Sequence, residues 1–360
     1  MQNSKDLTSA QPSNTGIHGG LLVEISELKR EDEKEWDSYI NSSPCSTFYH
    51  RIGWKTVLSE IYSHQPLYLV AKNDDKISGI FPLFKIKYPI FGNILVSLPY
   101  APFGGVCADD EQTGRQLLDA AKNHLRQNNY RSLEVRSLYE FPDAGSIDTS
   151  YYSMVLPLRN NFEDQWSGLR KSMRRYVKKA QSVKFEVNLN SHNITGFYNL
   201  YSQAMRDFGT PAHSNRFFNM LLQEFPDSTR IAEVEYEGEC IAAIFLLEFN
   251  GTMIYGWGAS DERYTMLYPN YSLFWDVILD GGSRHLRSFD FGRSMLNEGT
   301  YLFKTGWGAE PRQLYYFYCP QRSVNTKKNN PKRKIFSGIW RHLPKSVGLK
   351  LGPALRKYIP

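Results

Sequence analysis

The chain of 360 residues repeats part of itself, and this repeat restricts the folds that it can adopt. The stretch DDKISGIFPL at residues 74–83 aligns without gaps on GECIAAIFLL at residues 238–247. Farther along, RSLEVRS at 131–137 matches RSFDFGRS at 287–294 with one inserted residue, again about 160 residues later. Matching stretches in the same order at one separation indicate a duplicated unit. We therefore expect two domains of one fold in tandem.

Each copy has the pattern of a mixed sheet covered by helices. Residues 70–84 predict a hairpin, and residues 230–259 predict three strands whose last turn is an Asn-Gly pair, a strong hairpin signal. Apolar spacing predicts helices over 111–129 and 270–286, each followed by a short strand. The sequence thus predicts an α/β fold of the α+β sandwich kind, with two tandem domains that are each a mostly antiparallel mixed sheet flanked by helices.

Composition changes along the chain suggest where these domains begin and end. Residues 1–20 are polar and predict a disordered leader. We expect the first domain over 21–158, the second domain with the catalytic region over 159–320, and a basic linker and amphipathic tail over 321–360. The tail holds 11 Lys and Arg residues and no acid, so the rest of the chain carries a net charge of about −5. The positive charge of the protein therefore belongs to the tail.

The four cysteines are scattered, with no pair at metal-ligand or redox spacing. We therefore expect no zinc site, no disulfide framework and a reducing compartment. No apolar run approaches the roughly 20 residues that cross a bilayer, and the N-terminus lacks the apolar segment of a signal peptide. These features predict a soluble, cytoplasmic protein.

The tail itself favours contact with a membrane surface. Between residues 335 and 360 it has apolar side chains at helical spacing, bordered by Lys and Arg. This composition is typical of a helix that lies on an anionic membrane, which would make the protein peripheral on the inner face of the plasma membrane. Packing against the body of the protein and binding of RNA are the alternatives.

Eight stretches between about residues 35 and 320 resemble the tandem GNAT-fold transferases of the FemABX-like kind. The resemblance is greatest to the FemAB-related proteins found with exosortase/PEP-CTERM and exopolysaccharide loci of Gram-negative bacteria. The stretches, in order, are STFYHRIGW, GIFPL, SLPYAPFGG, LRKSMRRYVKKA, FYNLYSQAMRDFGTPAH, YPNYSLFWDVI, FDFGRS and GTYLFKTGWGAEP.

The resemblance implies transfer of an acyl or aminoacyl group from an activated donor to an amine or hydroxyl. The acceptor would be an envelope or exopolysaccharide precursor such as a nucleotide- or lipid-linked sugar. The donor would be an aminoacyl-tRNA, as in FemABX enzymes, or an acyl-CoA, with no tightly bound cofactor and no metal. Ordinary GNAT enzymes cradle the coenzyme A pyrophosphate in a glycine-rich loop. The corresponding stretch, DERYTMLYPNY at 261–271, has no glycine, so the donor stays open.

The Phe-Lys pair of that family maps onto Phe303–Lys304. A fixed cation beside aromatic rings such as Phe303 and Trp307 would stabilise the oxyanion of acyl transfer. Asp290 is positioned to accept a proton or to orient Lys304, and Arg293 to bind a phosphate or carboxylate. The structural alternatives are a surface lysine lying over aromatic rings and an Asp290–Arg293 ion pair that closes the strand. Glu134 and Arg136 hold the equivalent places in the first copy.

A second group of residues predicts substrate contacts. LRKSMRRYVKKA has six cations and no acid, which suits a polyanion, although a solvated helix face is the usual explanation of a charge run. His213 would serve as a base or ligand, Tyr100 would contact the acceptor, and Asn270 would either bind substrate or cap a helix. The predicted basic site comprises Arg170, Lys171, Arg174, Arg175 and Lys178. A non-catalytic protein of the same fold, holding polysaccharide precursors or partner proteins, is the alternative function.

Overall fold

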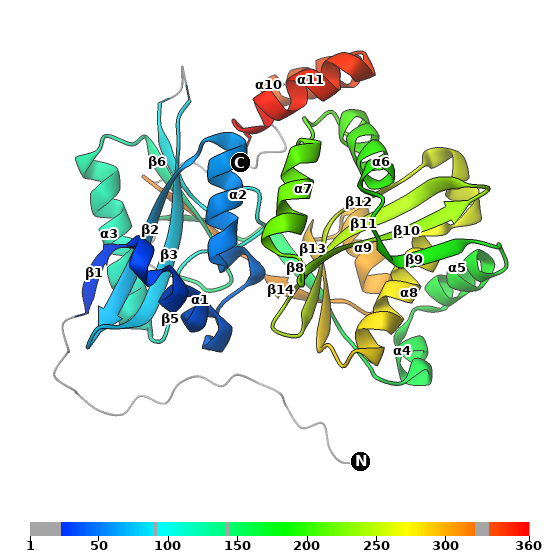
Figure 1. Ribbon diagram of the computed structural model, residues 1–360, viewed down its shortest axis with the longest axis horizontal. Coiled ribbons are helices and arrows are strands. Elements are labelled where there is room, and N and C mark those ends of the chain that lie inside the picture. The colour runs from blue at the N-terminus through cyan, green and yellow to red at the C-terminus, as the bar shows by residue number, and fades with distance from the viewer. Residues whose placement is uncertain (1–22, 89–91, 142–144, 321–330, 360) are drawn as a thin grey trace.

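A computed structural model describes residues 23–88, 92–141, 145–320 and 331–359 of the chain. In this part of the chain two sheets carry helices on their faces (Figure 1). Helix α2 (Ile52–Tyr62) and helix α7 (Asn215–Glu224) pack side by side between the sheets (Figure 1). The predicted leader at 1–20 lies outside the described residues.

The first sheet has the strand order β1-β2-β3-β4-β6-β15-β7, and β5 pairs with β3. Its strands are β1 (Glu24–Glu27), β2 (Gln65–Asn73), β3 (Lys76–Ile86), β4 (Ile94–Ser97), β5 (Cys107–Ala108), β6 (Ser132–Ser137), β7 (Ser146–Asp148) and β15 (Tyr315–Cys319). Its other helices are α1 (Glu33–Ser42) and α3 (Glu111–Gln127). Helix α3 begins where Asp110 accepts a hydrogen bond from the Thr113 N–H, and it buries one apolar face against the sheet.

The second sheet has the order β14-β8-β13-β12-β11-β10-β9. Its strands are β8 (Tyr151–Pro157), β9 (Glu186–Ser191), β10 (Thr229–Tyr236), β11 (Glu239–Phe249), β12 (Thr252–Ser260), β13 (Ser288–Met295) and β14 (Glu310–Gln313). Its other helices are α4 (Phe162–Gly168), α5 (Lys171–Gln181), α6 (Ile194–Asp207), α8 (Pro269–Ser283) and α9 (Gly299–Gly306). We call the first sheet with its helices the first lobe, and the second sheet with its helices the second lobe.

The predicted duplication is confirmed in the two sheets. The first matching pair of stretches forms β3 and β11, and the second pair forms β6 and β13. In each lobe the latter strand pairs in parallel with its neighbour, β4 with β6 and β12 with β13, whereas the remaining ladders are antiparallel. The mixed, mostly antiparallel sheets and the predicted hairpins are therefore present in both copies.

The lobes exchange a strand, which chain order does not predict. Strand β8 precedes residue 158 but pairs with β13 and β14 in the second sheet. Strand β15 lies in the predicted second domain but pairs with β6 and β7 in the first sheet. With a domain boundary at residue 158, β8 and β15 would each be assigned to the domain whose sheet they do not join. The exchange brings β8, β13 and β15 to the junction of the lobes.

The lobes also share one hydrophobic core. Phe48 of the first lobe lies 4.8 Å from Phe225 of the second, and Trp54 lies 6.3 Å from Phe217, measured between ring centroids. All four rings are buried. Burial of such aromatic surface is the main favourable term in packing, so we expect the lobes to form one rigid body.

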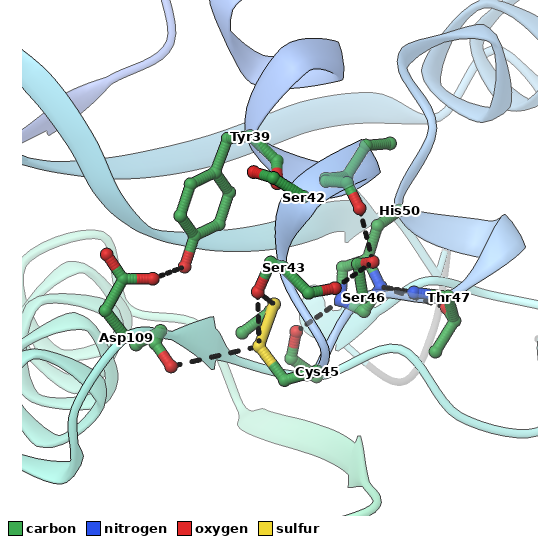
Figure 2. Close-up of a disulfide and its surroundings, with 12 residues drawn as sticks. Tyr39, Ser42, Ser43, Cys45, Ser46, Thr47, His50 and Asp109 are labelled. Carbon is green, nitrogen blue, oxygen red and sulfur yellow. Dashed lines mark hydrogen bonds between the residues drawn. A yellow bond between two sulfur atoms is a disulfide. The ribbon is translucent and has the colours of Figure 1, made fainter. Parts of the chain in front are cut away.

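The expectation of no disulfide is wrong for two of the four cysteines. Cys45, in the loop after α1, is bonded to Cys107 of β5, and Figure 2 shows this disulfide among the side chains that end α1. The two residues are 62 positions apart, a separation that matches no motif, so only the fold brings them together. The inference of a reducing compartment, which rested on unpaired cysteines, no longer has that support.

The tail forms two helices that pack on the body. Helices α10 (Pro331–Arg341) and α11 (Lys345–Arg356) contact α6, and Figure 1 shows them beyond the ends of α2, α6 and α7. Trp340 is buried, and the Ser337 hydroxyl donates to the Gly209 carbonyl at 2.9 Å. Helix α10 begins at Pro331, so the predicted linker ends before that residue. Residues 321–330 lie outside the described residues. None of the helices in the described ranges has the length and apolar character needed to cross a bilayer.

Candidate active site

Strand β13 presents Asp290 on the face opposite two phenylalanines, as the alternation predicts. Phe289 and Phe291 are buried in the core of the second lobe, and their ring centroids lie 4.6 Å apart. The Asp290 carboxylate accepts hydrogen bonds from the Ser153 hydroxyl of β8 at 2.7 and 2.9 Å and from the Gly292 N–H at 2.7 Å. Burial raises the pKa of Asp290, and the Ser153 and Gly292 hydrogen bonds oppose that rise.

A β-bulge after Asp290 turns two main-chain carbonyls toward Lys304. Between the pairs Asp290–Val155 and Arg293–Ser153, β13 has two residues where β8 has one, and Gly292 has a φ of +74°, which favours glycine. The Lys304 ammonium, on α9, donates to the carbonyls of Gly292 at 3.0 Å and Arg293 at 3.1 Å. An ammonium has three N–H groups, so the described residues leave one of them for a ligand.

Lys304 is half-buried and does not point into bulk water. Burial lowers its pKa to about 8, and the nearby Asp290 carboxylate opposes the fall. A half-buried cation with one open N–H has the chemistry of an oxyanion-stabilising group. The structure thus brings together Lys304 and Asp290 as the sequence predicts, with Phe303 beside them as a half-buried ring that packs on Tyr271, Phe274 and Trp307.

Arg293 does not form the ion pair that the structural alternative requires. Its Nη1 donates to the Tyr316 hydroxyl at 2.9 Å, and its guanidinium lies 4.5 Å from the Tyr151 ring centroid. The residue as a whole is exposed, while its hydrogen bond to Tyr316 is part-buried. It lies at the junction of the lobes, because Tyr151 belongs to β8 and Tyr316 to β15.

Two parallel strands stop pairing next to this cluster. Strands β12 and β13 pair only from Thr252–Ser288 to Ile254–Asp290. Beyond that point β12 continues through Tyr255–Ser260, whose residues are all half-buried, while β13 bulges away. We call the unpaired ends of these two strands the second-lobe notch. In the first lobe the loop after β4 occupies the same place, where the Gly104 N–H donates to the Arg136 carbonyl at 3.1 Å.

The predicted basic site forms one groove along α5. The start of α5 is anchored beside the lysine-bearing helix, because the Arg170 N–H donates to the Gly306 carbonyl at 3.0 Å. The groove is lined by Trp166, Lys171, Ser172, Arg174, Arg175, Lys178, Lys179 and Ser182. Arg174 is half-buried and the other cations are exposed. Helix α5 thus leads from the reaction centre to a surface that suits a polyanion.

Four predicted site residues lie elsewhere. His213 is fully buried at the lobe junction, where it is hydrogen bonded to the Tyr62 hydroxyl and to Arg356, and burial holds its pKa well below the ordinary value. The Tyr100 hydroxyl is hydrogen bonded to His64 Nε2 at 2.9 Å and donates to the Arg356 carbonyl at 3.3 Å. Neither contacts the Lys304 cluster, so a role for them in substrate binding has no support in the geometry.

Trp307 and Asn270 make contacts that hold the second lobe together. Trp307 is fully buried in the aromatic core of the second lobe, because the helix turn after Lys304 points inward. The Asn270 amide donates to the Ser260 hydroxyl at 2.8 Å, which joins the first turn of α8 to the end of β12. Asn270 is not the capping residue, because Tyr268 precedes the helix.

Three residues at the site were missed by sequence reasoning. Ser153, Tyr151 and Tyr316 belong to the exchanged strands, and the motifs of the duplicated pattern do not include them. The run YYSMVLP carries a strand signal but nothing that shows which sheet it joins. Only the pairing of β8 with β13 brings Ser153 to Asp290. No group of three or more potential metal ligands occurs among the described residues.

Comparison with known proteins agrees with this architecture. Residues 167–305 match the family described as acetyltransferase (GNAT) domain, which covers the notch, Asp290 and Lys304. The protein has a tandem GNAT fold. A search of curated protein sequences gives no match to the chain.

Solved structures with a similar fold cover both lobes. The crystal structure of FemX has a TM-score of 0.65 at 12% identity, covering 81% of this chain and 96% of that one. L-PGS from Bacillus licheniformis has 0.56 at 11%, covering 88% and 98%. A tandem GNAT protein from the clavulanic acid biosynthesis pathway has 0.51 at 10%, covering 82% and 98%. At these identities the likeness concerns the tandem GNAT fold alone.

Proposed function

We propose that the protein is an acyl or aminoacyl transferase that modifies an amine or hydroxyl of an envelope or exopolysaccharide precursor. The observation that carries the proposal is the environment of Lys304. Its ammonium is half-buried, held by two carbonyls of the β13 bulge, and has one N–H open. A cation fixed in this way stabilises negative charge that develops in a transition state more than it stabilises a neutral ground state.

The reaction would place the donor carbonyl next to Lys304. The second-lobe notch offers an unpaired edge of β12, on which an extended donor arm can form main-chain hydrogen bonds. Attack by the acceptor on the donor carbonyl gives a tetrahedral oxyanion, to which Lys304 donates its free N–H. Collapse of this intermediate breaks the bond to the thiolate of coenzyme A or to the ribose oxygen of the tRNA, and the proton lost by the acceptor passes through solvent to that leaving group. Asp290 accepts hydrogen bonds from Ser153 and Gly292, so its role is to hold the bulge that positions Lys304. In the first lobe the loop after β4 is hydrogen bonded to β6 at the equivalent position, so we expect one reaction centre, in the second lobe.

The groove along α5 would hold the anionic part of a substrate. Its five cations and lack of acids suit the phosphates of an acyl-CoA or an aminoacyl-tRNA donor, or those of a nucleotide- or lipid-linked sugar acceptor. No glycine occurs between β12 and the start of α8, and Arg263 there is paired with Asp261 at 2.7 Å. We therefore assign the anion contacts to α5. We also propose that the tail contacts an anionic membrane on its cytoplasmic side.

The proposal is tested by transfer from a panel of radiolabelled aminoacyl-tRNAs and acyl-CoAs to nucleotide- and lipid-linked amino sugars. Replacing Lys304 with Met should lower kcat by roughly 10²–10³, which is typical for loss of one oxyanion donor. Lys76→Met, at the exposed start of β3 in the first lobe, is a control for loss of a lysine outside the reaction centre and the α5 groove. Circular dichroism should show the same fold in all three proteins. Unchanged kcat in Lys304→Met would remove the assigned role, and absence of transfer by the native protein would favour a binding protein.

A further inference from the structure

The duplication places two equivalent arginines against one tyrosine ring. Arg136 of β6 and Arg293 of β13 occupy matching positions in the two copies. Both guanidinium carbons lie 5.7 Å from the centroid of the Tyr316 ring, which belongs to the exchanged strand β15. A direct comparison of the two arginines is therefore possible within one molecule.

Arg136 is neutralised inside the first lobe. It is 4% exposed, and its Nε and Nη2 donate to one Glu134 carboxylate oxygen at 3.0 and 2.9 Å. Its Nη1 donates to the Ala101 carbonyl at 2.9 Å. A buried arginine destabilises a fold unless its charge is paired with a carboxylate and its N–H donors are hydrogen bonded, and Arg136 meets both conditions. The first copy thus shows what this position looks like when its function is structural.

Arg293 has lost the equivalent partner. The residue that corresponds to Glu134 is Asp290, whose carboxylate is occupied by Ser153 and by the N–H of the inserted Gly292. Arg293 has no ion-pair partner in the described part of the chain, and the one hydrogen bond of its side chain there is from Nη1 to Tyr316. The insertion of one glycine therefore separates the pair and leaves a part-buried guanidinium whose other donors have no partner in the described part of the chain.

The surroundings hold this guanidinium in place. It lies over the Tyr151 ring at 4.5 Å, and Tyr151 and Tyr316 stack on each other at 5.1 Å. The Tyr316 hydroxyl in turn donates to the Pro102 carbonyl at 2.5 Å. Contacts with aromatic faces limit the freedom of an arginine, so less entropy is lost when it binds a planar anion through two parallel hydrogen bonds.

We propose that Arg293 is the binding site for an oxyanion group, a carboxylate or a phosphate, carried by the acceptor of the transfer reaction. The carbonyl of Arg293 accepts a hydrogen bond from Lys304, so the anchored group lies next to the reaction centre. The guanidinium faces β8 and β15, whereas the notch for the donor lies on the β12 side of the same strand. The two substrates would thus approach β13 from opposite edges. This assignment to the acceptor rests on the proposed function.

The anion site can be tested without any transfer reaction. Phenylglyoxal modifies exposed arginines, and the modified peptides of the full chain are quantified by mass spectrometry. Inorganic phosphate, pyrophosphate and succinate serve as probes, and at least one of them should slow the modification of Arg293 on the order of tenfold. Arg126 on α3, which is exposed and far from this cluster in the fold, is the control and should react at the same rate throughout. Protection by the phosphates alone indicates that the site binds a phosphate group, and protection by succinate alone indicates that it binds a carboxylate.

Two outcomes of the modification experiment would overturn the site. One is that Arg293 reacts equally fast with and without every probe. The other is that Arg293 does not react at all, which would mean that the guanidinium is inaccessible. Arg293→Lys keeps the charge but removes the planar fork, so in direct binding measurements with the protective probe it should fall between the native protein and Arg293→Gln.

The transfer assay then separates this inference from the proposed function. Arg293→Gln should raise the KM for the anionic acceptor on the order of tenfold and leave the KM for the donor unchanged. If the native protein transfers a group and Arg293→Gln does so with the same acceptor KM, the inference fails and the proposed function stands. If anions protect Arg293 but no transfer occurs with any donor, the anion site stands and the proposed function fails.

Discussion

At the scale of single residues, the two copies of the fold differ most in how they treat their charges. The first copy pairs Glu134 with Arg136 inside the protein, at 2.9 Å. The second copy inserts Gly292, gives Asp290 other partners and directs two carbonyls at Lys304. One extra residue in a strand thus converts a closed ion pair into a carboxylate, a lysine and an arginine with separate surroundings. This difference is why we assign the chemistry to the second lobe.

The protonation of Lys304 gives a prediction for the pH dependence of the transfer rate. Burial lowers its pKa to about 8 from 10.5, so the ammonium is lost as the pH rises through about 8. If the ammonium stabilises the oxyanion, kcat should have a falling limb near pH 8. Lys304→Arg, which stays charged, should be slower but lack this limb. A limb that persists at the same pH in Lys304→Arg would assign the titration to another group.

The lowered pKa of Lys304 also determines whether the free energy of unfolding rises or falls with pH. The unfolded chain keeps this proton up to about pH 10.5, whereas the folded protein releases it near pH 8. Between these values the unfolded state binds more protons, so this group makes the free energy of unfolding rise with pH. Denaturant titrations of the native protein and Lys304→Met between pH 7 and 10 measure the difference.

At the scale of elements, the sequence predicted the local structure better than the pairing. The hairpins, the helices at 111–129 and 270–286 and the basic helix follow from short-range patterns of apolar, turn and charged residues. The same patterns cannot show that β8 joins the second sheet or that β15 joins the first, because partner choice is a long-range property. For that reason the closeness of Lys304 and Asp290 was predictable, while the contacts of Ser153, Tyr151 and Tyr316 were not. His213 and Trp307 are buried, and their residue types are common both in sites and in cores, so the sequence alone does not separate the two roles.

The disulfide is an element-scale feature that can be tested directly. It joins the loop after α1 to β5 across 62 positions and so restricts the unfolded chain. Replacing Cys45 and Cys107 with Ser should lower the free energy of unfolding by about 2–4 kcal/mol, as measured in denaturant titrations. Cys240 and Cys319 are free, so the matched double replacement there should have a smaller effect. Equal stability of the native protein and Cys45→Ser/Cys107→Ser would show that the bond does not form in solution.

At the scale of the whole molecule, several connections hold the lobes in a fixed arrangement. The exchanged strands cross in both directions, the aromatic core is continuous, and α11 brings Arg356 to His213 at the junction. A fixed arrangement matters because Arg293 depends on rings from β8 and β15, which belong to different sheets. The tail also contributes to the outer surface. Four of the large apolar side chains that are exposed in the described residues belong to the tail or to the turn on which it packs: Phe208, Phe336, Ile339 and Leu351.

These exposed side chains, together with the acid-free charge of the tail, lead to a prediction about membranes. Sedimentation of the full chain with vesicles should show binding to phosphatidylglycerol-containing bilayers and little binding to pure phosphatidylcholine. Ile339→Asp places a charge at a 62% exposed apolar position and should lower the bound fraction on the order of tenfold. Arg341→Glu/Lys350→Glu should have a similar effect that salt reduces, because each basic residue contributes about 1 kcal/mol near an anionic surface.

Matched variants away from the tail decide between membrane contact and simple packing. Met266→Asp changes another highly exposed apolar residue, and Arg115→Glu/Arg126→Glu reverses two exposed charges on α3 of the first lobe. Both should sediment as the native protein does, because neither alters the tail. If the native protein ignores anionic vesicles, or if the control variants lose binding as strongly as Ile339→Asp, the tail only packs against the body. In that case the buried Trp340 and the Arg356–His213 contact explain how the tail is attached, and its basic residues are solvated surface charges.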